Sequence, residues 1–255
     1  MRKLVWTLTM LVLIVGFRTY SVAEPDPDQH KSISAMSVAE LDRAGDLARA
    51  EKDYRRAMEY FRAAIAKDPK NATLYNKLGM TELKAGSMYA ARADFQKAAK
   101  LNPKYANAMN NLGAVEYSEK KYGAALKYFK KAVALEETSA TFHVNLGSAW
   151  FAQNKVDRAL AEYTRALELD PEVLSSSSRT GVVAQMTTPE ERAKYSYMLA
   201  KIYAKRGDFE SCLRCLRKAK EDGYPQLANV YKDEEFASLR QDARLSEVVP
   251  PPVAK

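Results

Sequence analysis

The feature that most constrains the fold of this chain is a repeat of 34 residues. Four consecutive units cover 38–71, 72–105, 106–139 and 140–173. Three positions carry the pattern most clearly: the eighth is always glycine, the twenty-fourth is always aromatic and the twenty-seventh is always alanine. A period of this length indicates an array of small supersecondary units rather than one globular core.

Each unit contains two stretches in which apolar residues recur three and four positions apart, as they do in amphipathic helices. Small residues at the eighth, twentieth and twenty-seventh positions allow the two helices to approach closely, and proline near the end of three units stops the second helix. One such pair cannot bury its apolar face alone, so neighbouring units must stack. We therefore predict an all-α fold with helix pairs at about 42–67, 72–101, 106–135, 140–169 and 189–222.

The pattern resembles the tetratricopeptide repeat (TPR) family, which has this period. The resemblance covers about two-thirds of the chain beyond its N-terminal segment. It implies a right-handed superhelical solenoid of antiparallel helix pairs, with about five repeats. The expected segments are TPR repeats 1–4 over 37–173, a Ser-rich loop over 174–188, a degenerate fifth repeat over 189–223, a C-terminal capping segment over 224–249 and a tail over 250–255.

Residues 1–23 have the pattern of an export signal. A basic start precedes an apolar run over 4–17, which is shorter than the ~20 residues that a membrane-spanning helix needs. Ser21 and Ala23 place small residues at the −3 and −1 positions of a signal-peptidase site. We expect cleavage after Ala23, followed by a linker over 24–36, in an exported protein that is periplasmic or secreted. The alternative is a protein tethered to the membrane by its uncleaved apolar run.

The composition argues against an enzyme. The chain has two His and two Cys, which are too few and too scattered for a convincing zinc site. The sequence contains neither a glycine-rich phosphate loop nor a nucleophile elbow. We predict no catalytic residue, no metal and no cofactor. The 40 Lys and Arg are interleaved with 32 Asp and Glu, which also argues against a nucleic-acid partner.

Cys212 and Cys215 form the motif Cys-Leu-Arg-Cys within the second helix of the predicted fifth repeat. Redox-active pairs favour a helix N-terminus, where the helix dipole lowers the thiol pKa. A bond between residues three apart in a regular helix is also strained. Two interpretations remain open, a disulfide and a pair of packed free cysteines, and a thiol-redox function is a third alternative.

In the TPR family the first helix of each repeat lines an inner groove, and asparagine recurs here at groove positions. Asn111 and Asn145 occupy the sixth position of their repeats, and Asn76 and Asn110 the fifth. Asparagine is a mediocre helix former, but its amide offers a donor and an acceptor. We expect Asn111 and Asn145 to lie outside the core, where they would hold the backbone of an extended peptide. The alternative is a solvated groove whose asparagines form only a local network.

A second feature of the predicted groove is an apolar stripe at the twelfth position, formed by Leu83, Tyr117 and Phe151. The predicted peptide-binding residues are Asn76, Lys77, Lys84, Asn110, Asn111, Tyr117, Asn145 and Phe151. The resemblance thus implies a non-enzymatic scaffold that binds a protein or an extended peptide in its concave groove. The alternative is a membrane-anchored assembly subunit that uses its convex face.

Overall fold

The computed structural model describes residues 32–174 and 188–252. The predicted signal segment and nearly all of the predicted Ser-rich loop lie outside the described residues. The chain divides into two compact units, Met1–Met36 and Ser37–Lys255. Within the first, the described part contains one short 3-10 helix, η1 (Ile33–Ala35). All other described helices belong to the second unit.

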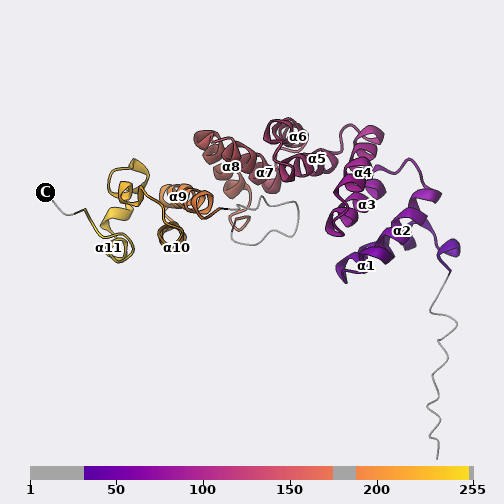
Figure 1. The fold of residues 1–255 in the computed structure, drawn as a ribbon, viewed down its shortest axis with the longest axis horizontal. Coiled ribbons are helices and arrows are strands. Elements are labelled where there is room, and N and C mark those ends of the chain that lie inside the picture. Colours follow the sequence, from indigo (N-terminus) through magenta and orange to yellow (C-terminus); the bar gives the residue numbers. More distant parts are fainter. Residues whose placement is uncertain (1–31, 175–187, 253–255) are drawn as a thin grey trace, which may run out of the picture. The chain divides into compact units, whose positions relative to one another are not determined.

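The described residues form helices and turns, and no strand occurs among them. Five helix pairs follow one another along the chain, and a series of short helices completes it (Figure 1). The pairs are α1 (Val38–Ala50) with α2 (Tyr54–Lys67), α3 (Ala72–Lys84) with α4 (Met88–Leu101), α5 (Ala106–Ser118) with α6 (Tyr122–Leu135), α7 (Ala140–Ala152) with α8 (Val156–Leu169), and α9 (Pro189–Lys205) with α10 (Phe209–Glu221). The short helices are η2 (Leu227–Tyr231), η3 (Glu234–Phe236), η4 (Leu239–Gln241) and α11 (Arg244–Val248).

The helix ends follow from capping chemistry in the sequence. The predicted ends are confirmed, except that α1 begins at Val38 rather than at 42. Ser37 caps this helix, because its hydroxyl accepts from the Glu40 amide at 3.3 Å while its own amide donates to the Glu40 carboxylate at 2.7 Å. Thr188 and Glu191 form the same capping box at the start of α9. Both capping boxes satisfy amide groups that the first helical turn leaves without partners.

We call the first helix of each pair the inner helix and the second the outer helix. Within every pair the two helices pack along each other, and each outer helix also packs on the inner helix of the next pair. Neighbouring inner helices also contact each other directly, α3 with α5 and α5 with α7. This nearest-neighbour packing confirms the predicted all-α solenoid of stacked helix pairs.

Glycine at the eighth position is required by the aromatic ring at the twenty-fourth. A Cβ atom added to Gly113 would lie 2.6 Å from the ring of Phe129, and one added to Gly45 would lie 2.6 Å from the ring of Phe61. Such distances are far below van der Waals contact, so only glycine fits. The fit is looser in the fourth pair, where a Cβ atom added to Gly147 would lie 3.3 Å from the ring of Tyr163.

The short helices after α10 cover the end of the solenoid. η3 packs on α9, and α11 packs on α10. Phe236 of η3 is fully buried, and Tyr197 of α9 stacks on Tyr224 with ring centroids 4.4 Å apart. This terminal segment therefore buries the apolar face that the last helix pair would otherwise expose.

Candidate functional site: the inner-helix surface

Neighbouring inner helices are joined by hydrogen bonds between side chains that lie 35 residues apart. In each case a residue at the sixth position of one repeat donates to the fifth position of the preceding repeat. We call these contacts the inter-repeat ladder. Its pairs are Lys77–Asp42, at 2.7 and 2.8 Å, Asn111–Asn76, at 2.9 Å, and Asn145–Asn110, at 2.8 Å.

The amide part of the ladder is buried. Asn110 and Asn145 are 2% exposed, and Asn111 is 8% exposed. The side-chain nitrogen of Asn110 also donates to the side-chain oxygen of Asn111 at 3.5 Å, which joins the two amide pairs into one chain of hydrogen bonds. The prediction that Asn111 and Asn145 lie outside the core is therefore wrong. The asparagines do form a network, but it is buried, and each of the two donates to an amide of the adjacent repeat.

The charged part of the ladder is partly exposed. The ammonium group of Lys77 contacts Asp42 and also the Asp46 carboxylate at 2.7 Å, and Arg49 donates to Asp46 at 2.8 Å. Burial opposes the charge on Lys77, but its hydrogen bonds to Asp42 and Asp46 and the charges of both outweigh that effect, so its pKa is raised. The side chains of Asp42 and Asp46 remain 31% and 39% exposed. We call these four residues the charged cluster, and they were not among the residues singled out from the sequence, apart from Lys77.

The three residues of the predicted apolar stripe do not form one exposed surface. Leu83 packs, half-buried, against the hydrophobic cluster between the second and third repeats. Tyr117 is half-buried, with its ring 5.1 Å from that of Tyr122. Phe151 is only 8% exposed and meets the ring of Tyr195 edge-on at 5.7 Å. The expectation of an apolar stripe open to a partner is therefore wrong for Phe151, whereas Tyr117 keeps part of its surface exposed.

The polar ladder does not continue into the fifth repeat. Val144 and Met198 occupy the equivalent fifth and sixth positions, and both are buried in the large hydrophobic cluster of the C-terminal half. Tyr195 of α9 lies between the rings of Phe151 and Tyr163, at 5.7 and 5.5 Å. Aromatic packing thus replaces hydrogen bonds at this junction.

Cys212 and Cys215 are free thiols in the structure, the first buried and the second half-buried. Burial raises the pKa of Cys212 to about 12 and that of Cys215 to about 11. A redox-active pair requires the opposite shift, because the thiolate is the reactive form. The structure therefore contains packed cysteines and gives no support to the disulfide or to the thiol-redox alternative.

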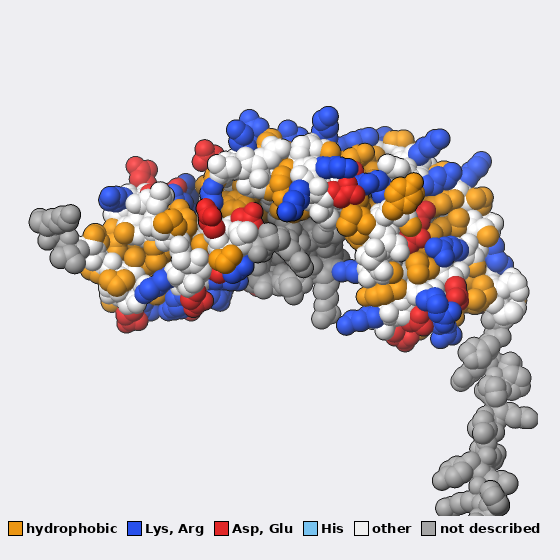
Figure 2. Space-filling model, viewed as in Figure 1, with side chains coloured by type: hydrophobic (Ala, Val, Ile, Leu, Met, Phe, Trp, Pro, Cys, Tyr) orange, Lys and Arg blue, Asp and Glu red, His pale blue; other side chains and the backbone are white. Residues whose placement is uncertain are grey.

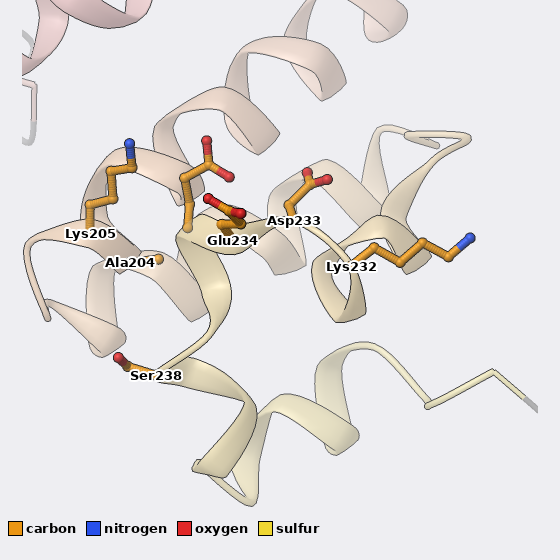
Figure 3. A pocket seen from close by; sticks show the side chains of 7 residues that line it. Ala204, Lys205, Lys232, Asp233, Glu234 and Ser238 are labelled. Atoms are coloured by element: carbon orange, nitrogen blue, oxygen red, sulfur yellow. The ribbon is translucent and has the colours of Figure 1, made fainter.

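A hollow of about 590 Å³ lies between the end of α9 and the 3-10 helices that follow α10 (Figure 3). Asp233, which lines it, accepts a hydrogen bond from the Tyr197 hydroxyl at 2.9 Å and pairs with Lys201 at 2.8 Å. Lys201 also lies 3.5 Å from the Glu235 carboxylate. These contacts fasten the terminal segment to α9, so we interpret the hollow as part of the cap.

The described residues do not assemble a metal centre. No group of three or more His, Cys, Asp or Glu in these segments is placed to hold a metal ion. His143 is engaged within the protein, since its ring nitrogens lie 2.7 Å from Glu162 and 3.1 Å from the Glu137 carbonyl oxygen. None of the helices in the described segments is long and apolar enough to span a bilayer.

Sequence models of the tetratricopeptide repeat match most of the repeat region. One matches residues 70–138, a second matches 121–173, and a third matches both 41–71 and 193–221. The chain belongs to the tetratricopeptide repeat family. The matches include the fifth helix pair, whose sequence departs most from the glycine-and-aromatic pattern.

Solved structures show the same fold. A crystal structure of MamA protein has a TM-score of 0.50 at 20% identity, covering 77% of this chain and 95% of that one. A MamA fragment (41-end) from Desulfovibrio magneticus RS-1 has a TM-score of 0.51 at 19% identity, covering 72% and 93%. TTC0263, a thermophilic TPR protein of Thermus thermophilus, has 0.51 at 21% identity, covering 80% and 100%. No curated protein sequence matches this chain.

Proposed function

We propose that this TPR protein is an exported scaffold that binds an extended protein or peptide segment along the inner helices α1, α3 and α5. The observation that carries the proposal is the charged cluster, whose carboxylates keep about a third of their surface exposed. Exposed Lys84 lies on the same face of α3 as Lys77, two helical turns further on. A partner is thus offered charges of both signs on a preformed surface.

The buried amide ladder has a supporting role in this proposal. Hydrogen bonds between adjacent inner helices fix their spacing before a partner arrives, so less conformational freedom is lost on binding. Direct contact with the partner is assigned to Lys77, Lys84 and Tyr117, which retain exposed surface. The four asparagines and Phe151 hold these contact residues in place.

Export is tested by mapping the N-terminus of the protein after expression in a bacterial host with intact secretion. A mature chain that begins at Glu24 supports the export proposal. A chain that retains Met1 and fractionates with membranes supports the tethered alternative. Mass spectrometry of the purified protein distinguishes the two outcomes.

Binding is tested by isolating partners of the exported protein, identifying the bound segment and titrating it as a synthetic peptide. Replacing Lys84 and Tyr117 together by Ala should raise the Kd by about 5- to 150-fold, because each contact contributes about 0.5–1.5 kcal/mol. The part due to Lys84 should fade above about 0.15 M salt, where exposed charges are screened.

Lys155→Ala provides the control, because Lys155 is exposed at the start of the outer helix α8. Its Kd should equal that of the wild type. If the double variant is folded and binds the peptide with unchanged Kd, the partner does not use the inner helices.

A further inference from the structure

Positive charge is concentrated on the outer helices of the first three repeats. Together α2, α4 and α6 contain ten Lys or Arg and two acidic residues. The inner helices α1, α3 and α5 contain four Lys or Arg and five acidic residues. The excess on the three outer helices is as large as the formal charge of +8 of the whole chain. The interleaving of charges along the sequence thus conceals their separation in space.

The exposed surfaces of α4 and α6 carry lysine and no exposed acid. The single acid of α4, Asp94, is half-buried beside Glu82, and α6 contains none. We call the exposed lysines of these two helices and of the turn after α4 the outer lysine face. It consists of Lys97, Lys100, Lys104, Lys127, Lys130 and Lys131. In Figure 2, Lys and Arg side chains gather along the upper edge of the view.

The next outer helix shows that this charge pattern is local. α8 contains two Arg and three acidic residues, and Arg165 pairs with Glu168 at 3.0 Å. The outer helices share the same place in each repeat, so packing does not require lysine there. Lys97 and Lys130 lie over the rings of Tyr75 and Trp150, at 5.8 and 4.6 Å. The other four lysines make no ion pair with another described residue, so neither packing nor charge pairing explains their presence on the outer lysine face.

The chemistry of this face fits an anionic lipid surface better than a nucleic acid or an acidic peptide. Its cations are all lysines, which act as flexible point charges and do not impose the fork geometry with which arginine binds phosphate groups. Successive aromatic rings, which single-stranded nucleic acids use for stacking, are absent from the exposed surfaces of these two helices. One exposed ring, Tyr89, lies on α4 with 86% of its surface accessible. Tyrosine at a charged surface is typical of the membrane–water interface.

We propose that the outer lysine face docks on the anionic headgroups of a membrane, with Tyr89 at the interface. The charges are spread over two adjacent outer helices, as contact with an extended surface requires. Each lysine near an anionic bilayer adds to the attraction, and the total falls as salt rises. This docking does not depend on the proposed peptide binding, because it uses the outer helices and leaves the inner ones accessible.

The test compares two variants of the full chain with equal change in charge. The first replaces Lys100, Lys104, Lys127 and Lys131 by Gln. The control replaces Lys155, Lys205, Lys218 and Lys232, which are exposed elsewhere in the molecule, by Gln. Binding is measured by co-sedimentation with phosphatidylcholine vesicles that contain either no anionic lipid or about 30% phosphatidylglycerol. The neutral vesicles report any binding through the N-terminal apolar run, which all proteins in the test share.

The wild type should bind the anionic vesicles at least about tenfold more tightly than the neutral ones, and salt near 0.5 M should abolish the difference. The outer-face variant should lose about tenfold in affinity, whereas the control should stay within about twofold. Equal losses of affinity in both variants would show that only the net charge of the protein matters, and this would overturn the proposal. Tighter binding to an oligonucleotide or to polyglutamate than to the vesicles, with the same loss in the outer-face variant, would assign the face to another partner and also overturn it.

Discussion

The third and fifth repeats solve the same packing problem in different ways. In the third, the ring of Phe129 occupies the space in which a Gly113 side chain would lie. In the fifth, the equivalent residues are Ala200 and Leu216, and both are fully buried. The larger residue at one position is therefore matched by the smaller one at the other. Glycine is required by the ring opposite it, and the fold itself tolerates other pairs of suitable volume.

The junctions between repeats differ in the same manner. Asparagine side chains connect the second repeat to the third and the third to the fourth. Between the fourth and the fifth, Val144 and Met198 take those positions, and Tyr195 packs against two aromatic rings. The comparison indicates that a polar and an apolar junction can both hold adjacent inner helices. They should respond differently to substitution.

The largest expected loss of stability comes from substitutions at the polar junctions. Replacing Asn111 and Asn145 together by Ala removes both donors and leaves the buried carbonyl oxygens of Asn76 and Asn110 without them. We expect the free energy of unfolding in urea to fall by about 2–5 kcal/mol, since each buried unsatisfied group costs about 1–3 kcal/mol. Asn107, exposed on the same helix α5, provides the control, and Asn107→Ala should change stability by about 0.5 kcal/mol or less. Equal effects would show that the ladder contributes no stability.

The next effect concerns the glycine positions. Gly113→Ala should destabilise the protein by about 1–3 kcal/mol, because the new methyl group overlaps the ring of Phe129. Gly147→Ala should stay within about 1 kcal/mol of the wild type, since its methyl group lies 3.3 Å from its neighbours and alanine favours the helix. Thermal unfolding measures both.

Combining Phe129→Leu with Gly113→Ala gives the third repeat the same two side chains, Ala and Leu, that occupy these positions in the fifth repeat. The double variant should lose less stability than the sum of the two single losses. Simple additivity would mean that the two positions are not coupled and that the comparison between the repeats is wrong.

The third prediction concerns the dependence of stability on pH, to which the second repeat should contribute and the third should not. Glu82 is buried and accepts from Arg62 at 3.0 Å, and its carboxylate also interacts with the side chain of Asp94. Burial of Asp94, together with the charge of Glu82, raises the pKa of Asp94 to about 7. The third repeat has Glu116 and Tyr128 at the equivalent positions, so it lacks this pair of carboxyl groups.

Because the folded-state pKa of Asp94 exceeds that of the unfolded chain, its contribution to stability is complete below about pH 4 and is lost as the pH rises through about 7. The half-exposed position of Asp94 limits the loss between pH 5 and 8 to about 1–2 kcal/mol. Asp94→Asn should remove this part of the pH dependence, and Asp157→Asn, an exposed change on α8, should not. Tm measured against pH would contradict the prediction if both variants kept the wild-type profile.

The smallest effect is expected at the glycine-equivalent position of the fifth repeat. Ala200→Gly should destabilise the protein by about 1 kcal/mol, because glycine is the poorer helix former and Leu216 does not overlap the methyl group. A stabilisation measured in urea would mean that Ala200 is as crowded as an alanine at position 113 would be.

The sequence predicted the fold well because its signals are local. The period of 34 residues gives every repeat the same pair of helices, and each capping box joins residues only three apart. These patterns placed nearly every helix end correctly. The role of the asparagines was predicted wrongly, because their burial depends on how the adjacent repeat lies over them. A polar residue at the edge of an inner helix has the same sequence pattern whether it faces a partner or the next repeat. The separation of charge between inner and outer helices was predictable from the sequence, since counting the charged residues of each expected helix reveals it.

The 35-residue spacing of the ladder has a consequence for building longer versions of this protein. The second and third repeats each supply an acceptor to the repeat that follows and a donor to the one that precedes. A second copy of residues 106–139 placed directly after the first would set the Asn110 amide of one copy opposite the Asn111 amide of the next. The array is thus extensible by whole modules at this point. A module inserted at the boundary before α9 would place an amide side chain against an apolar one. The array is therefore not extensible by the same module at this boundary.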